Sequence, residues 1–295
     1  MFNNRRLRAA LVLVLLLIVI GTGAYYIHSH PEVTRELGRI NPLLLILLLL
    51  SYGILLMWWM GVYNATLALC GKPLKQKENM LLSIYSTLAN FFLPLQSGPG
   101  VRAAYLKSRH KVPISSYILA SLVYFGIYAI ISSGFLFVAS HYWWLDIPAI
   151  AAAAVISYLV IYIAKNRFEK KSGKIILDLS KRKILVLALF TFGQLLTQAL
   201  IYGIELHAVT AQTHPIRDIS YTGAANFSLF VSLTPGAIGF REAFLELSRS
   251  LHHFTTSQIL AANVIDRGVF LVFLGILFLI MLATHAKDRF INPKA

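Results

Sequence analysis

The chain has 295 residues, of which 57% are hydrophobic and 13% are charged, and its formal net charge is +15. Soluble domains carry about 25% charged residues, so this composition excludes a water-soluble protein and indicates an integral membrane protein. The positive charge does not indicate nucleic-acid binding, because the basic residues gather in short loops between apolar runs, as the positive-inside rule requires.

About six apolar runs are long enough to cross the hydrocarbon layer, which takes about 20 helical residues. In chain order we predict spanning helices at 7–27, 43–70, 115–138, 144–164, 184–206 and 258–284. The first run is too long for a signal peptide and is followed by a poor cleavage site, so we expect it to be retained. In this arrangement most basic clusters fall on one face, which predicts cytoplasmic N and C termini in the cytoplasmic (inner) membrane.

Two distant stretches share one pattern, Gly-x-Arg-x-Ala-aromatic-Leu, after a short apolar segment that stops at Pro and Gly. The first contains Asn90, Pro94, Gly98, Gly100 and Arg102, and the second contains Asn226, Pro235, Gly236, Gly239 and Arg241. Interrupted apolar segments at corresponding positions of two halves point to a transport site. We therefore expect a single membrane domain over residues 1–295, with internal repeats at about 43–138 and 184–284.

Charge placement predicts how these two segments enter the membrane. Basic residues flank segment 80–94 on both sides, so we expect a re-entrant hairpin from the cytoplasm. Segment 221–235 follows an external loop, so we expect it to enter from the opposite face. Irregular backbone at membrane depth requires burial in protein or a wet cavity. The predicted fold class is all-α and polytopic, with two re-entrant broken-helix hairpins in an inverted repeat and Pro and Gly residues as hinges or gates.

Arginine and asparagine residues of the two hairpins are candidate substrate-binding groups. Arg102 and Arg241 each stand near the start of a helix, where free N–H groups and a planar guanidinium favour phosphate. The alternative is an interfacial arginine that touches lipid non-specifically. Asn90 and Asn226 can hydrogen-bond the backbone of their own hairpins or contact a headgroup, and the structural role is favoured.

Acidic residues after the second hairpin predict a solvated stripe. Glu242 and Glu246 are four residues apart, with Arg249 on the same stripe. Glu242 could also hold Arg241 or gate a cation. For Glu205, near a helix end, we expect a wet or interfacial carboxylate.

Asp266 and Arg267 lie inside the apolar helix 258–284. Charges at such depth usually face a cavity or a partner. Adjacent residues on a helix do not face each other, so each is expected to have another partner. The pair forms either a structural salt bridge to another helix or part of the substrate path, including a proton relay.

Residues for metal or cofactor binding show no recognisable spacing. The single Cys70 and the nine His residues form no ligand pattern, so we predict no metal and no cofactor. The phosphate-binding loop of nucleotide-driven transporters is also missing from the sequence.

The segment 90–102, the run 234–243 and the pair Asp266-Arg267 resemble the lysylphosphatidylglycerol synthase transmembrane family, also described as flippase-like. The resemblance covers nearly the whole chain, and its most specific part is Pro-Gly-x-x-Gly-x-Arg-Glu. It implies a membrane region that, when fused to an aminoacyl-transferase domain, moves aminoacylated phosphatidylglycerol across the bilayer. We expect no transferase activity from this chain by itself, because it carries no such soluble domain. It also has Tyr124-Phe125-Gly126 where the repeat suggests an acidic–basic pair, which predicts an asymmetric polar site.

The leading hypothesis is a flippase-like transporter for an anionic phospholipid or lipid-linked precursor. Its expected partners are membrane lipids with phosphate headgroups and not nucleic acid. An intramembrane enzyme that modifies lipid headgroups is an alternative, as is a scaffold subunit for a lipid-modifying partner enzyme.

Overall fold

The computed structural model describes residues 41–92, 97–172, 175–210, 214–231 and 240–291, which fold into ten α-helices and one short 3₁₀ turn. The predicted helix 7–27 lies outside the described residues, as do the hinge positions Pro94, Pro235, Gly236 and Gly239. The predicted all-α class is confirmed for the part of the chain that the structure covers.

Five helices in the described ranges are long and apolar enough to cross a membrane. They are α3 (Pro42–Leu69), α6 (Ile114–Leu136), α7 (Asp146–Ser172, preceded by the 3₁₀ turn Trp143–Leu145), α8 (Lys181–Val209) and α12 (Thr256–Ile291). They match the five predicted spans that follow 7–27, although α7, α8 and α12 extend beyond the predicted ends. The chain is therefore a multi-pass membrane protein.

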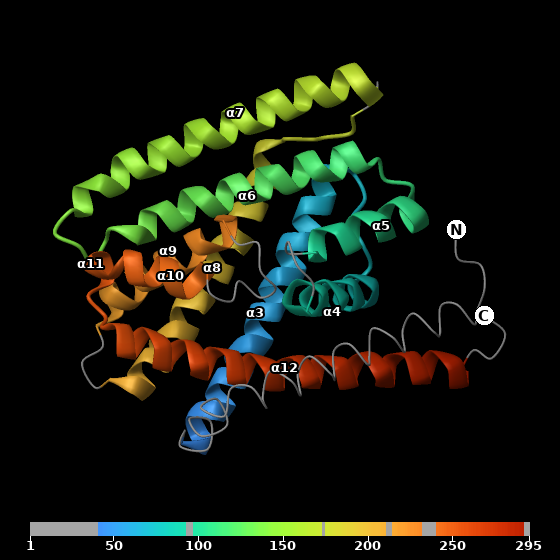
Figure 1. Cartoon of the computed structure of the whole chain (residues 1–295). Helices are drawn as coiled ribbons and strands as arrows, with labels where there is room; N and C mark the ends of the chain where they lie inside the picture. The colour runs from blue at the N-terminus through green and yellow to red at the C-terminus, as the bar shows by residue number, and fades with distance from the viewer. Residues whose placement is uncertain (1–40, 93–96, 173–174, 211–213, 232–239, 292–295) are drawn as a thin grey trace.

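The shorter helices form two groups. The first comprises α4 (Gln76–Phe92) and α5 (Gly98–His110), and the second comprises α9 (Pro215–Val231), α10 (Phe240–Leu247) and α11 (Arg249–His252). In Figure 1 the first group lies to the right of α3 and the second to its left. Helices α4 and α9 have 17 residues each, fewer than the roughly 20 that a full crossing takes.

Helices α3 and α8 pack closely through two reciprocal aromatic-on-glycine contacts. A Cβ atom added to Gly193 of α8 would lie 2.7 Å from the Trp58 ring of α3, and one added to Gly61 of α3 would collide with the Phe190 ring of α8. The two rings also meet, with centroids 6.0 Å apart. Small residues at such crossings let transmembrane helices approach each other, so both glycines have a packing reason.

Polar contacts hold the two helices together where α3 ends and α8 begins. Helix α3 ends at a left-handed glycine, Gly71, whose φ is +68°, a conformation that favours glycine at helix ends. The Lys183 ammonium of α8 then donates to the Ala68 carbonyl at 2.7 Å and pairs with the Asp178 carboxylate at 2.8 Å.

Two apolar cores flank these central helices. One joins α3 and α8 to α9 and α12 through residues such as Leu55, Ile201 and Ile265. The other joins α3 and α8 to α5 and α6 through residues such as Val62 and Leu106. Helix α4 contributes to both cores, with Ile84 and Leu88 in the first and Leu82 in the second. Helix α7 packs along α6 on the outside (Figure 1), and its most apolar window contributes no buried residue, as expected for a lipid-facing helix.

Candidate functional site

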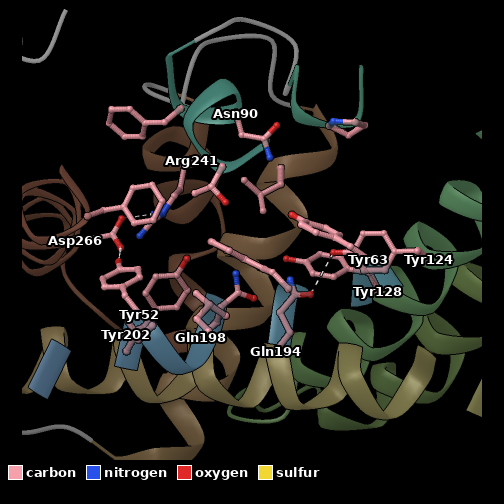
Figure 2. Close-up of a pocket in the computed structure, with 18 of the residues that line it drawn as sticks. Tyr52, Tyr63, Asn90, Tyr124, Tyr128, Gln194, Gln198, Tyr202, Arg241 and Asp266 are labelled. Atoms are coloured by element: carbon pink, nitrogen blue, oxygen red, sulfur yellow. Dashed lines mark hydrogen bonds and ion pairs between the residues drawn. The ribbon is translucent and has the colours of Figure 1, made fainter. Parts of the chain in front are cut away.

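A cavity of about 230 Å³ lies between the spanning helices and both groups of short helices. Figure 2 shows Arg241 and Asp266 on one side of it, Tyr63 and Tyr124 on the other, and Gln194 and Gln198 below. Most of its lining is aromatic or polar, although the surrounding helices are strongly apolar. The polar lining residues are Tyr52, Tyr63, Thr87, Asn90, Arg102, Tyr124, Tyr128, Gln194, Gln198, Tyr202, Arg241, Asp266 and Arg267.

Arg102 of α5 is a buried cation, 6% exposed. Its guanidinium carbon lies 3.6 Å from the centre of the Tyr63 ring, and its Nε donates to the Tyr117 hydroxyl at 2.9 Å. Its Nη1 is buried without a hydrogen-bond partner in the described part of the chain, and no acidic residue there pairs with it. Arg102 therefore offers a donor and a positive charge to an anion.

Arg241 of α10 is equally buried but has a counter-ion. Its Nη1 donates to Oδ2 of Asp266 at 2.6 Å, while the Tyr52 hydroxyl donates to the other carboxylate oxygen at 2.5 Å. Both oxygens of Asp266 are thus occupied by donors from two different helices. Nε and Nη2 of Arg241 are buried and lack a partner among the described residues, so this arginine also retains donors for a second acceptor.

A second ion pair at the cavity joins the same two helices, α10 and α12. Arg267 donates to Glu242 at 3.1 Å, whereas its neighbour in sequence pairs with Arg241. The expectation that Glu242 holds Arg241 is therefore wrong. The reason is that α10 and α12 face each other, so consecutive residues on each helix reach different partners. Arg249 pairs with Glu246 at 3.4 Å on an exposed surface, so the predicted solvated stripe holds for these two residues but not for Glu242, which pairs with the buried Arg267.

The two cavity arginines repeat one local arrangement. Arg241 lies over the Tyr202 ring of α8 at 4.8 Å, as Arg102 lies over Tyr63 of α3. The two tyrosine–arginine pairs have the same sequence separation. The repeat seen in the sequence therefore has a spatial counterpart, with an arginine from a short helix stacked on a tyrosine of a spanning helix.

Asn90 and Gly98 close the first pair of short helices. The Asn90 amide oxygen accepts a hydrogen bond from the Gly98 backbone at 2.7 Å, the structural role favoured for this residue, and Asn90 also lines the cavity. A Cβ atom on Gly98 would lie 2.5 Å from that oxygen and 2.6 Å from the Ser86 carbonyl, whereas one on Gly100 would meet open space. Packing thus explains Gly98 but not Gly100.

One sequence expectation about this region needs correction. Helix α5 begins at Gly98, so Arg102 lies a full turn inside the helix and not beside its free N–H groups. Asn226 is fully buried and accepts from the Tyr128 hydroxyl of α6 at 2.7 Å, with its Nδ2 unpartnered among the described residues. The backbone of its own segment at 232–239, the partner expected from the sequence, lies outside the described residues.

Several cavity residues carry no recognisable sequence signal. Tyrosines of apolar helices usually read as packing or interfacial residues, so their convergence was not predicted. Gln194 and Gln198 did offer a signal, because two amides one turn apart inside an apolar span usually face a polar partner. The expectation for Glu205 is wrong, since this carboxyl is 1% exposed.

The unmatched position of the first half also reaches the cavity. Tyr124 and Phe125 line it, as do Asp266 and Arg267 of the second half. Figure 2 places Tyr124 and Asp266 on opposite sides. The polar site is therefore asymmetric, with its acidic group on one side.

Comparison with curated proteins and with solved structures returned no significant match. The sequence does match the family described as lysylphosphatidylglycerol synthase TM region over residues 7–277, a range that includes both buried arginines and the Asp266-Arg267 pair. The chain belongs to the lysylphosphatidylglycerol synthase TM region family.

Proposed function

We propose that the protein is a flippase-like transporter that moves an anionic phospholipid or lipid-linked precursor across the cytoplasmic membrane. The observation that carries the proposal is a set of guanidinium donors at the cavity, on Arg102 and Arg241, that find no acceptor among the residues the structure describes. Buried donors without acceptors are costly and uncommon in folded proteins. A phosphate would supply acceptors for both arginines, whose planar guanidinium groups suit its geometry.

The charge balance of the cavity supports an anionic ligand. Arg241 and Arg267 are paired with Asp266 and Glu242, respectively, whereas Arg102 has no acidic partner in the described ranges. An uncompensated charge in a desolvated site costs several kcal/mol. An anion that binds beside Arg102 would remove much of that cost and would find its positive charge already in place.

The cavity size is compatible with a headgroup and not with a whole lipid. Pockets for drug-sized ligands have about 300–1,000 Å³, and this cavity has about 230 Å³. The acyl or prenyl chains would stay in the bilayer, beside apolar helix faces such as that of α7. The aromatic walls of the cavity would cover the headgroup during passage, as the tyrosines already cover the arginines.

The proposed route uses the two groups of short helices as re-entrant hairpins. In the proposed topology, α4 and α5 enter from the cytoplasm and α9 and α10 enter from outside, and both termini are cytoplasmic. The repeated tyrosine–arginine pair supports two equivalent groups in this arrangement. Arg102 and Arg241 would then receive the phosphate from opposite faces.

The direct test is reconstitution of the full chain into liposomes that contain a labelled anionic phospholipid or a polyprenyl phosphate. We expect faster transbilayer exchange than in protein-free liposomes. Arg102→Ala should slow it by about 10- to 100-fold, the equivalent of a charged hydrogen bond worth about 1.5–3 kcal/mol. Arg109→Ala removes an exposed charge from the same helix and should leave the rate unchanged.

Each alternative outcome has a clear meaning. Exchange equal to that of empty liposomes for every anionic lipid would refute the transport proposal. Chemical conversion of the headgroup would instead identify an intramembrane lipid-modifying enzyme. If Arg102→Ala and Arg109→Ala slow the exchange equally, surface charge attracts the lipid and the buried cation does not.

A further inference from the structure

Glu205 of α8 is a buried carboxyl that the proposed lipid path does not use. It is 1% exposed, and its Oε1 is buried without a hydrogen-bond partner in the described residues. It does not line the cavity, but it interacts electrostatically with Asp266 and Arg241, which do. A second buried carboxyl is therefore close enough to interact with the ion pair that lines the cavity.

The ionisable groups around Glu205 come from five helices. They are Tyr52 of α3, Tyr202 of α8, Tyr221 of α9, Arg241 of α10 and Asp266 of α12, and Arg267 lies next to Asp266 in sequence. Of the two cations, Arg241 pairs with Asp266 and Arg267 pairs with Glu242. The described residues therefore provide two cations for three carboxyl groups, and Glu205 is the carboxyl without a cation of its own.

A buried carboxylate that has no counter-ion is unstable compared with its protonated form. Desolvation favours the neutral state, and a second carboxylate nearby favours it further. Asp266 accepts hydrogen bonds on both oxygens, from Tyr52 and Arg241, and such bonds stabilise the ionised form. Figure 2 shows this arrangement, with Asp266 between its two donors. Both effects favour Glu205 over Asp266 as the group that holds a proton.

We propose that Glu205 and Asp266 form a proton-binding site that couples lipid movement to the proton gradient. The inference rests on the transport proposal and names its driving force. When a substrate phosphate takes over Arg241, Glu205 passes its proton to the released Asp266 carboxylate and takes up another proton from water on the side where the lipid enters. When the phosphate leaves, Asp266 gives its proton to water on the side where the lipid leaves and pairs with Arg241 again. One proton is bound and one is freed in each cycle.

Infrared spectroscopy of the purified full chain tests the site itself. The wild-type protein should show a protonated carboxyl C=O band at neutral pH, and Glu205→Gln, which keeps the size of the side chain, should remove it. Glu246→Gln, which changes an exposed carboxylate, should retain it. A wild-type spectrum without this band would overturn the proposal, even if the variant failed to fold. A band that persists in folded Glu205→Gln would overturn it as well.

Transport under an imposed pH gradient tests the coupling. For one proton per lipid, a gradient of one pH unit supports up to about tenfold accumulation in one leaflet. The wild-type protein should accumulate labelled lipid, and Glu205→Gln should lose this accumulation. Exchange without a gradient is measured first, and if it fails there, the transport proposal is wrong. If exchange occurs but the wild type ignores the gradient, or Glu205→Gln still responds, only the coupling is wrong.

Discussion

The guanidinium of Arg102 lies 3.6 Å from the centre of the Tyr63 ring. A cation–π contact contributes about 0.5–2 kcal/mol when the cation is desolvated, and this energy comes from the face of the ring and not from the hydroxyl. We predict that Tyr63→Leu slows anionic-lipid exchange by up to about 30-fold, whereas Tyr63→Phe keeps most of the rate. Exchange in liposomes measures both variants. Equal losses in the two would assign the effect to the hydroxyl and contradict a role for the ring face.

The ion pair of Arg241 and Asp266 predicts a strong dependence of stability on its two members. Their side chains are 8% and 10% exposed, and removal of one partner from a buried pair costs about 3–5 kcal/mol. Asp266→Asn should therefore lower the thermal unfolding midpoint in detergent, and Arg241→Gln combined with Asp266→Asn should recover part of the loss. Glu246→Gln breaks an exposed pair and should change stability little. Additive effects of the two buried changes would contradict direct coupling.

Gly98 and Gly100 provide a matched pair of glycine positions. Gly98→Ala should displace Asn90, because the added methyl group would lie 2.5 Å from the amide oxygen and 2.6 Å from a backbone carbonyl. We expect lower stability and slower lipid exchange from this variant. Gly100→Ala points into open space and should be neutral or slightly stabilising, because alanine is the better helix former. Thermal unfolding of the two variants side by side provides the measurement, and equal midpoints would contradict the steric argument.

The packing of α3 against α8 predicts a second steric effect. Gly193→Ala should destabilise the fold, because its Cβ would lie 2.7 Å from the Trp58 ring, and overpacking costs about 1–3 kcal/mol. Gly53→Ala lies on α3 with no atom within 4 Å of its Cβ and serves as the control. Chemical unfolding in detergent compares the two. If Trp58→Ala fails to relieve the cost of Gly193→Ala, another contact is responsible.

Asp178 predicts a pH dependence outside the membrane spans. The hydrogen bond from the Lys183 ammonium, together with one from the Ser180 backbone, lowers the pKa of Asp178. A lowered pKa stabilises the fold above the unfolded value of about 3.9, and the contribution is lost as the pH falls through the folded value. The wild type should therefore be more stable than Asp178→Asn at neutral pH, and the difference should shrink below about pH 4. The pair is exposed, so high salt should reduce the difference at neutral pH.

The apolar helices could be predicted from the sequence because each needs its own long hydrophobic run. The five described spans lie where the runs of apolar residues place them, and the intramembrane position of Asp266 and Arg267 follows from the same pattern. The choice of ion-pair partners could not be predicted. It depends on the rotation of α10 against α12, which the residues of neither helix specify alone.

The burial of Glu205 could not be inferred for a related reason. The predicted span ends at residue 206, whereas α8 continues to Val209, so the carboxyl lies a turn deeper than the hydrophobic run suggests. The tyrosines at the cavity come from three helices far apart in the sequence. Only the fold brings them together, and their spacing within each helix resembles ordinary packing.

The reciprocal contacts of Trp58 with Gly193 and of Phe190 with Gly61 form a tightly packed seam between α3 and α8. A tightly interdigitated seam does not slide by small amounts, because packed interfaces resist gradual deformation. Alternating exposure of the cavity would then come from movement of the short helices relative to the α3–α8 pair. Each group of short helices contacts the α3–α8 pair through an arginine stacked on a tyrosine. The contacts about which the short helices would move therefore include the arginines proposed to bind the lipid phosphate.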